Sequence, residues 1–154
     1  MATFTAGDRS TEVVAADRKA LWAALTDPDL LPRLTPYLHS IDVDGDRWRW
    51  NMARIPVLGI SVAPSFTEQM TFDEPRRITF THDPRSEHEK AGVEGSYQLE
   101  EAEGGTRLSM QVDICVDLPL PGAARAAVQG AMRGVMAVMG RRFAANLLRH
   151  LSDG

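Results

Sequence analysis

The sequence predicts an α+β fold in which a curved, antiparallel, seven-stranded sheet wraps around a long C-terminal helix. Three observations predict it. One strand pattern is followed by two short helical patterns, then come six strand patterns joined by turns, and residues 122–151 have the periodicity of one long helix. Strands joined by hairpins form a curved sheet because sheets twist. The apolar face of such a sheet must be covered, and the terminal helix is the element that can cover it.

The first three predicted elements lie before Pro36. Residues 10–16 are predicted to be a strand that ends near two consecutive valines. Asp17 then occupies the position of a helix N-cap, where a carboxylate accepts hydrogen bonds from the first free amides. Apolar residues at helical spacing predict a short helix over residues 18–26, and a second short helix is predicted over residues 29–34.

The middle of the chain is rich in strand patterns. The six strands are predicted at residues 38–43, 47–55, 66–72, 78–82, 93–101 and 106–118. Asp44-Gly45 predicts a hairpin turn in which both central residues have positive φ. Residues 56–64 stay undecided between strand and loop because Pro and Gly interrupt them, and the polar residues 83–92 are predicted to be a loop. In the last strand apolar and polar residues alternate, as in a sheet with one buried face.

The long helix is predicted over residues 122–151, after two prolines that end the last strand. Its apolar residues at spacings of three and four are Val128, Met132, Val135, Met136, Met139, Phe143, Leu147 and Leu151. Small residues, among them Gly130, Gly134 and Ala137, lie between them. Because small side chains leave volume and Met adapts to irregular shapes, this helix is predicted to line a cavity. The alternative is a well-packed core in which large side chains of the sheet fill that volume.

Composition and charge limit the class of protein. The chain has 154 residues, of which 44% are hydrophobic and 25% charged, and this fits one globular domain and excludes a disordered chain. The net charge of −4 argues against a nucleic-acid-binding protein. The single cysteine excludes an intramolecular disulfide. No signal sequence and no stretch suited to stable membrane insertion is found, so a cytoplasmic monomer or homodimer is expected.

Three stretches of the sequence resemble one known family. They are Val13-Val14-Ala15-Ala16-Asp17 with Leu21-Trp22 and Leu25-Thr26-Asp27-Pro28, then Asp73-Glu74-Pro75-Arg76-Arg77-Ile78, and Gly95-Ser96-Tyr97-Gln98-Leu99 followed by Gly104-Gly105-Thr106-Arg107-Leu108. The sequence thereby resembles the START-like (SRPBCC) superfamily, which includes polyketide cyclase/dehydrase-like proteins, plant pollen-allergen relatives and lipid-transfer domains. The resemblance extends over residues 10–151. It implies that residues 1–154 form a single START-like domain with the helix-grip fold.

The resemblance also implies a cavity between the concave face of the sheet and the long helix. We expect a hydrophobic small molecule to bind there without a cofactor, for example a lipid, a polyketide or an aromatic metabolite. The residues expected to contact it are Trp48, Trp50, Met52, Phe66, Glu68, Met70, Phe80, His82, Tyr97, Met110, Val112, Met132, Val135, Met136, Met139 and Phe143. Such a mostly apolar lining with a few polar groups is typical of small-molecule sites.

Three polar residues on the predicted inward face leave an enzyme as an alternative. Strand alternation places Glu68, His82 and Tyr97 among apolar neighbours. Burial shifts the pKa values of such groups toward neutral pH, where they can act as general acids or bases. They are the candidate catalytic residues of a polyketide cyclase or dehydratase. The competing structural explanation puts Glu68 in water beyond a bulge, His82 at the rim and Tyr97 in the core. A further alternative is a protein-interaction module without a ligand.

A cluster of His and Glu residues raises the alternative of a metal site. It consists of His82, Glu87, His88 and Glu89. The spacing of these residues matches no standard ligand pattern. A solvated loop explains them better, so no metal site is predicted.

Overall fold

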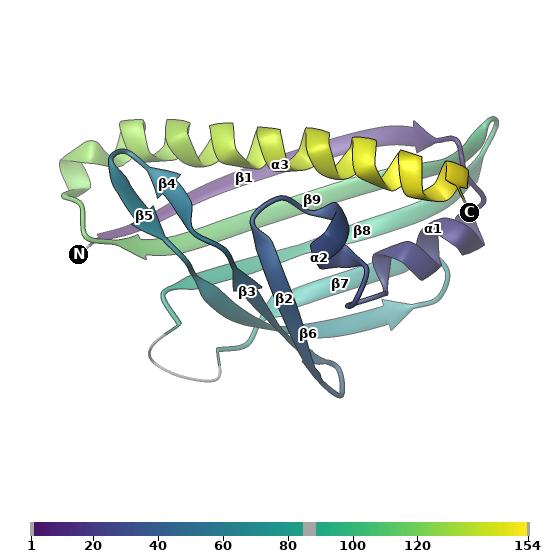
Figure 1. The fold of residues 1–154 in the computed structure, drawn as a ribbon, viewed down its shortest axis with the longest axis horizontal. Coiled ribbons are helices and arrows are strands. Elements are labelled where there is room, and N and C mark those ends of the chain that lie inside the picture. Colours follow the sequence, from purple (N-terminus) through teal and green to yellow (C-terminus); the bar gives the residue numbers. More distant parts are fainter. Residues whose placement is uncertain (1, 85–88, 154) are drawn as a thin grey trace.

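The computed structural model describes residues 2–84 and 89–153. A long helix covers a curved sheet, as Figure 1 shows. The elements in chain order are β1 (Ala2–Val14), α1 (Arg18–Leu25), α2 (Leu31–Leu34), β2 (Leu38–Asp44), β3 (Arg47–Met52), β4 (Ile55–Val57), β5 (Ile60–Val62), β6 (Ser65–Asp73), β7 (Arg77–His82), β8 (Ala91–Ala102), β9 (Gly105–Leu118), the 3-10 turn η1 (Gly122–Ala124) and α3 (Arg125–Asp153). The antiparallel seven-stranded sheet has the order β1-β9-β8-β7-β6-β3-β2. The predicted helix-grip architecture is therefore confirmed.

The first and last strands of the chain lie side by side. β1 pairs with β9 in one unbroken antiparallel register, from Ala2 opposite Leu118 to Val14 opposite Thr106. From β6 to β9 each strand pairs with the next one along the chain. β1 therefore forms one free edge of the sheet, and β2 forms the other.

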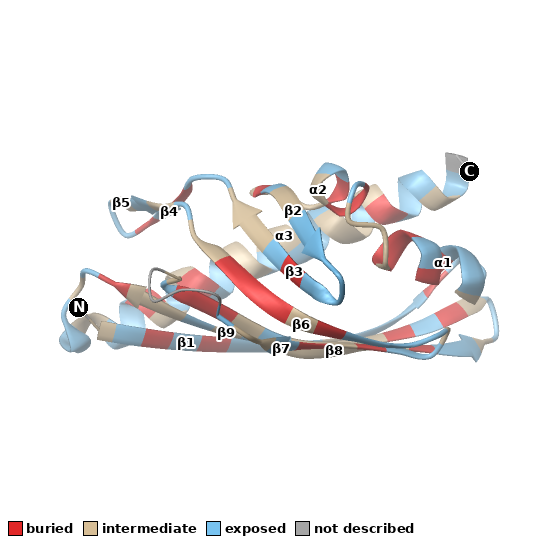
Figure 2. Cartoon of the chain, turned by 90° about the horizontal axis from the view of Figure 1, so that it is seen from below, coloured by how far each residue is buried: buried red, intermediate tan, exposed pale blue. Residues whose placement is uncertain are grey.

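α3 lies over the concave side of the sheet and runs along β1, as the views in Figures 1 and 2 agree. Two of its side chains bind the free edge of β1. Arg125 donates a hydrogen bond to the carbonyl oxygen of Thr3 at 3.1 Å, and Gln129 donates one to the carbonyl oxygen of Thr5 at 3.1 Å. The Arg125 guanidinium also lies 5.5 Å from the centre of the Phe4 ring, within cation–π range. These contacts fix the N-terminal half of the helix at the edge of the sheet.

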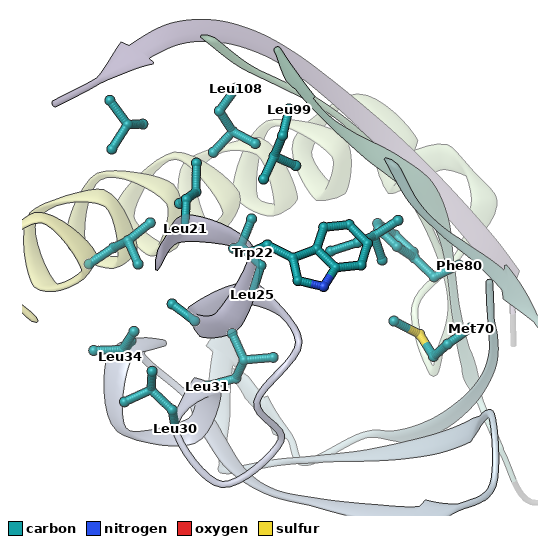
Figure 3. Packing of buried hydrophobic residues seen from close by; sticks show 14 of the residues in the cluster. Leu21, Trp22, Leu25, Leu30, Leu31, Leu34, Met70, Phe80, Leu99 and Leu108 are labelled. Atoms are coloured by element: carbon teal, nitrogen blue, oxygen red, sulfur yellow. The ribbon is translucent and has the colours of Figure 1, made fainter. Parts of the chain in front are cut away.

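The C-terminal half of α3 covers the larger of two apolar clusters, together with α1 and α2. Figure 3 shows Leu21 of α1 near Leu108 of the sheet, while Trp22 extends toward Phe80 and Met70. Leu21 is fully buried. Burying a side chain of this size stabilises a fold by roughly 1.5–3 kcal/mol. The apolar face of the short helix α1 therefore holds it in place.

The second cluster lies under the N-terminal half of α3. Phe4 of β1, Leu118 of β9 and Val128 of α3 are its fully buried members, with 0%, 1% and 0% of their surface exposed. Met52 packs against both clusters, so it marks their junction. Between the two clusters lies the centre of the concave face, opposite the middle of α3.

Several predicted boundaries were wrong, most clearly in β1. The strand begins at Ala2 and not at residue 10, because its pairing with β9 continues over residues 2–9. Asp17 precedes α1 as predicted, but its side chain makes no capping hydrogen bond. The turn between β2 and β3 consists of Gly45 and Asp46, and only Gly45 has positive φ, at 62°.

Other differences concern the segments that Pro and Gly interrupt. β3 ends at Met52, and the undecided residues 56–64 contain most of the separate β4–β5 hairpin. β8 begins at Ala91 and shortens the predicted loop, of which residues 85–88 lie outside the described part of the chain. Within the described residues, no helix has the length and apolar character needed to cross a membrane.

Candidate functional site

Glu68 lies in the middle of β6, with Trp48 of β3 and His82 of β7 as its register partners. Residues opposite each other in a sheet share a face. Because Trp48 belongs to the main core cluster, the Glu68 side chain lies on the concave face. Only 2% of the surface of Glu68 is exposed. The strand alternation that buries Phe66 and Met70 on this face therefore also buries a carboxyl group.

Among the described residues, three buried side-chain polar atoms on this part of the sheet have no hydrogen-bond partner. They are Nε1 of Trp50, one carboxyl oxygen (Oε2) of Glu68 and Nδ1 of His82. A buried polar group without a partner costs roughly 1–3 kcal/mol, so native proteins contain few of them. These three atoms, on the neighbouring strands β3, β6 and β7, are here called the polar centre, and each can bind a polar group from outside the chain.

Burial determines the protonation state of Glu68. Desolvation raises the pKa of Glu68 to about 9, and the nearby Trp50 indole partly offsets the rise without reaching hydrogen-bond geometry. The ion pairs among the described residues do not include Glu68. The carboxyl group is therefore neutral at pH 7 and carries a proton that it can donate.

Tyr97 of β8 is close enough to Glu68 to be influenced by its charge. Desolvation raises the pKa of the Tyr97 phenol above its usual value, and the Glu68 carboxylate adds to this rise. The Tyr97 ring packs edge-on against Phe80 with ring centres 5.2 Å apart. Tyr97 is therefore a neutral phenol whose ring is part of the aromatic lining.

A row of aromatic rings extends along the face beside Glu68. Trp22 contacts Phe72, Phe72 contacts Trp48, and Trp48 contacts Trp50, with ring centres 6.3, 5.8 and 6.0 Å apart. The Trp50 ring is stacked on Phe66, at 6.3 Å and an interplanar angle of 10°. The polar centre thus lies next to flat aromatic surfaces, which can pack against a planar molecule.

The residues predicted to contact a ligand divide into two groups by burial. Trp48, Phe66, Glu68, Met70, Phe80 and Met132 are buried, whereas Trp50, Met52, His82, Tyr97, Met110, Val112, Val135, Met136, Met139 and Phe143 are half-buried. With the exception of Met139, the half-buried apolar residues of this set pack against one or both core clusters. They belong to α3 and to strands of the sheet. Protein atoms therefore do not fully cover the apolar side chains in the middle of this face.

The small residues of α3 do not line this region, contrary to the prediction. Gly130, Gly134 and Ala137 are exposed. No atom beyond the local helix backbone lies within 4 Å of the position of a Cβ at Gly130 or Gly134. Gly134 follows the buried Met132 by two residues, which is about 200° around a helix. These small residues therefore face solvent on the outer side of α3.

A half-open cavity of about 470 Å³ lies beside His82 and was not predicted. Residues of β1, β7, β8, β9 and α3 line it, among them Gly7, Gly92 and Arg133. A Cβ at Gly92 would lie 2.7–2.9 Å from atoms of the His82 ring, so glycine is needed for this ring position. A glycine inside a strand is the sequence signal that could have indicated this close approach.

The same cavity contains Cys115, the free cysteine of the chain. Burial raises the pKa of the Cys115 thiol, and the neighbouring Asp117 raises it further. The thiolate is the nucleophilic form of cysteine. Cys115 is therefore not activated for nucleophilic catalysis.

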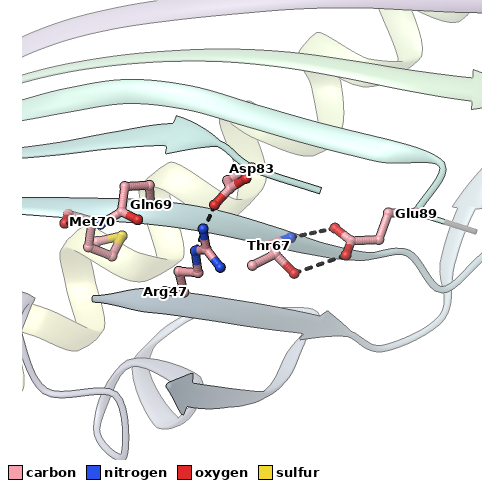
Figure 4. A network of polar contacts seen from close by, with 6 residues as sticks. All are labelled: Arg47, Thr67, Gln69, Met70, Asp83 and Glu89. Carbon is pink, nitrogen blue, oxygen red and sulfur yellow. Dashed lines mark hydrogen bonds and ion pairs between the residues drawn. The ribbon is translucent and has the colours of Figure 1, made fainter. Parts of the chain in front are cut away.

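Figure 4 shows polar contacts that join β3 and β6 to Asp83 and Glu89, which lie between β7 and β8 in the sequence. Thr67 donates hydrogen bonds to the two carboxyl oxygens of Glu89, from its backbone N–H at 2.6 Å and its hydroxyl at 2.9 Å. Arg47 and Asp83 form an ion pair at 2.8 Å. Of the cluster weighed as a metal site, Glu87 and His88 lie outside the described residues. Over residues 2–84 and 89–153, no three His, Cys, Asp or Glu side chains are grouped as metal ligands.

Comparison with known families gives one match over most of the chain. Residues 8–148 match the family described as "Polyketide cyclase / dehydrase and lipid transport". This range includes Trp50, Glu68 and His82. The sequence has no match among curated proteins.

Solved structures share the fold at low sequence identity. A conserved protein from Geobacillus kaustophilus has a TM-score of 0.73 at 14% identity, with 97% of this chain and 96% of that chain covered. The Zhui aromatase/cyclase from Streptomyces sp. R1128 has a TM-score of 0.68 at 11% identity, covering 96% and 94%. A protein from Rhodobacter sphaeroides has a TM-score of 0.59 at 25% identity, covering 96% and 93%.

Proposed function

The chain belongs to the polyketide cyclase/dehydrase and lipid transport family, and we propose that it binds a hydrophobic small molecule between the concave face of the sheet and α3. The polar end of this molecule contacts Glu68, and its apolar body packs against the half-buried residues of the face. The three unpartnered polar atoms of Trp50, Glu68 and His82 carry this proposal. An apolar face with a few convergent polar groups is typical of a small-molecule site.

The proposal accounts for two features that a closed core does not explain. The central apolar residues of the concave face, such as Val112 and Met136, are only half-buried. A ligand would remove their remaining apolar surface from water, which contributes roughly 25 cal/mol per Å². A hydrogen bond to the same ligand would satisfy the buried carboxyl group of Glu68.

The test uses two neighbouring positions on α3. Met136 is half-buried and packs with the second core cluster, whereas Ala137 is exposed. The neutral dye N-phenyl-1-naphthylamine fluoresces strongly when it enters an apolar site. We expect Met136→Trp to weaken dye binding at least ten-fold and Ala137→Trp to leave it unchanged. Circular dichroism melting shows whether each variant is folded.

Two results would contradict the binding function. One is a wild-type protein that does not bind the dye at micromolar concentration. The other is a Met136→Trp variant that melts at a lower temperature while dye binding stays unchanged, because overpacking a filled core costs roughly 1–3 kcal/mol.

Acid catalysis is a second candidate function, and one observation favours it. Glu68 is a neutral acid opposite His82, and both have an unpartnered polar atom. Glu68 could protonate a leaving hydroxyl group while His82 removes a proton next to a carbonyl, so that water is lost and an enone forms. The probe is 4-hydroxy-4-phenyl-2-butanone, whose dehydration is followed by ultraviolet absorbance. An enzyme loses this rate in Glu68→Gln, whereas a wild-type rate equal to that of buffer excludes dehydration of this probe.

A further inference from the structure

We propose that the ligand is a neutral molecule whose carbonyl oxygen accepts hydrogen bonds from Glu68 and Trp50. This inference rests on the proposed binding function and specifies the chemical class of the ligand. It follows from which hydrogen-bonding roles remain open in the polar centre.

The role of Trp50 is fixed by its chemistry. An indole Nε1 has one hydrogen and no lone pair in the ring plane, so it can only donate. This N–H is buried and has no acceptor in the described part of the chain. A ligand atom that satisfies it must therefore be an acceptor.

The role of Glu68 follows from its surroundings. The side chain lies between Trp48 and the His82 strand position, with Phe66 and Met70 next to it on the same face. No Lys or Arg of the described residues forms an ion pair with it. A carboxyl group in such an apolar environment stays protonated, so it presents one O–H donor. Its raised pKa agrees with this state.

The two donors can meet on a single oxygen. The Trp50 indole lies close enough to the Glu68 carboxyl group to lower its pKa, while Nε1 of Trp50 and Oε2 of Glu68 have no hydrogen-bond partner among the described residues. A carbonyl oxygen has two lone pairs and can accept from both groups at once. His82 does not decide between ligand classes, because a neutral imidazole nitrogen is either a donor or an acceptor.

A cationic ligand fits this centre poorly. An ammonium group would need Glu68 in its ionised form, and with a pKa of about 9 this form is roughly 100-fold less populated than the neutral form at pH 7. The same donors discriminate against a purely apolar ligand, because they would remain buried and unpaired. A planar carbonyl compound also suits the flat surface that Trp50 and Phe66 present at an interplanar angle of 10°.

The test compares three naphthalene probes of nearly equal size by isothermal titration calorimetry at pH 7. They are 2-acetylnaphthalene, its isostere 2-isopropenylnaphthalene, in which a CH₂ group replaces the carbonyl oxygen, and the cationic 1-(2-naphthyl)ethylamine. We expect the ketone to bind at least ten-fold more tightly than the alkene, and the amine to bind more weakly than the ketone.

Two variants test whether the preference for the ketone comes from hydrogen-bond donation by residue 68 or from the shape of its side chain. Glu68→Gln keeps an N–H donor at this position and should preserve the preference for the ketone. Glu68→Met removes the donor at similar length and should reduce the preference to less than three-fold, while binding of the alkene is retained. Retained alkene binding also shows that the variant is folded.

The outcomes distinguish this inference from the binding function. Equal wild-type affinity for ketone and alkene, or tighter binding of the amine, would overturn the assignment of Glu68 and Trp50 as donors while the binding function stands. If none of the probes and no N-phenyl-1-naphthylamine binds, the binding function itself fails.

Discussion

Replacing Glu68 by Gln should change how the stability of the protein depends on pH. In the folded protein the pKa of Glu68 is about 9, whereas its usual value is 4.5. Below pH 4.5 the carboxyl group is protonated in both the folded and the unfolded chain. Between pH 4.5 and 9 only the unfolded chain ionises, so the folded state loses stability as pH rises. The neutral Gln side chain removes this loss at nearly unchanged size.

The size of the effect follows from the interval between the two pKa values. One pKa unit corresponds to about 1.4 kcal/mol, and the interval from pH 5 to pH 8 lies almost entirely between 4.5 and 9. Glu68 therefore lowers the free energy of unfolding by about 4 kcal/mol across this interval. The burial of Glu68, with 2% of its surface exposed, leaves little solvent to screen the effect.

Urea unfolding at pH 5 and pH 8 measures this difference. The difference in unfolding free energy between Glu68→Gln and wild type should grow by about 4 kcal/mol in favour of the variant from pH 5 to pH 8. Glu12→Gln, on the exposed part of β1, is the control and should show no such trend. A pH-independent difference at Glu68 would refute the conclusion that its carboxyl group is neutral in the folded protein.

Three further predictions concern other parts of the molecule. Gly92→Ala places a methyl group less than 3 Å from the His82 ring, so thermal unfolding should show a loss of roughly 1–3 kcal/mol. Gly134→Ala on the outer side of α3 should instead be neutral or raise stability by up to about 1 kcal/mol, and equal losses would contradict both placements. Amide hydrogen exchange should be faster in the β4–β5 hairpin, which is outside the main sheet, than in β9, and equal protection would contradict this order.

The sequence predicted the sheet well where local pattern and tertiary pairing agree. β9 alternates apolar and polar residues, and it lies in the sheet as predicted from residue 106 to residue 118. The first half of β1 was missed: Phe4 and Ala6 alternate with Thr3 and Thr5, but residues 7 and 8 interrupt this strand pattern, and there the order comes from pairing with β9. Long-range pairing of this kind is not encoded in a short window of sequence.

The candidate site was predictable in part. Strand alternation placed Glu68 among inward-facing residues, and the structure buries it there. Among the described residues, Oε2 of Glu68 and Nε1 of Trp50 lack hydrogen-bond partners. This depends on how side chains of different strands are oriented, and a sequence pattern does not predict such orientations. The position of Gly134 was wrong because the prediction used the composition of α3 and not its helical phase, which places this residue opposite Met132.

The attachment of α3 to β1 also bears on strand pairing between molecules at this edge of the sheet. An exposed edge strand presents unpaired backbone groups on which a second chain can form another strand, and long edges of this kind promote aggregation. Arg125 and Gln129 occupy the carbonyl oxygens of Thr3 and Thr5 and so block the first part of this edge. Farther along β1, exposed charged residues disfavour pairing with a strand of another molecule, because they keep this edge hydrated. The helix that covers the concave face thus also protects the strand on which it rests from intermolecular pairing.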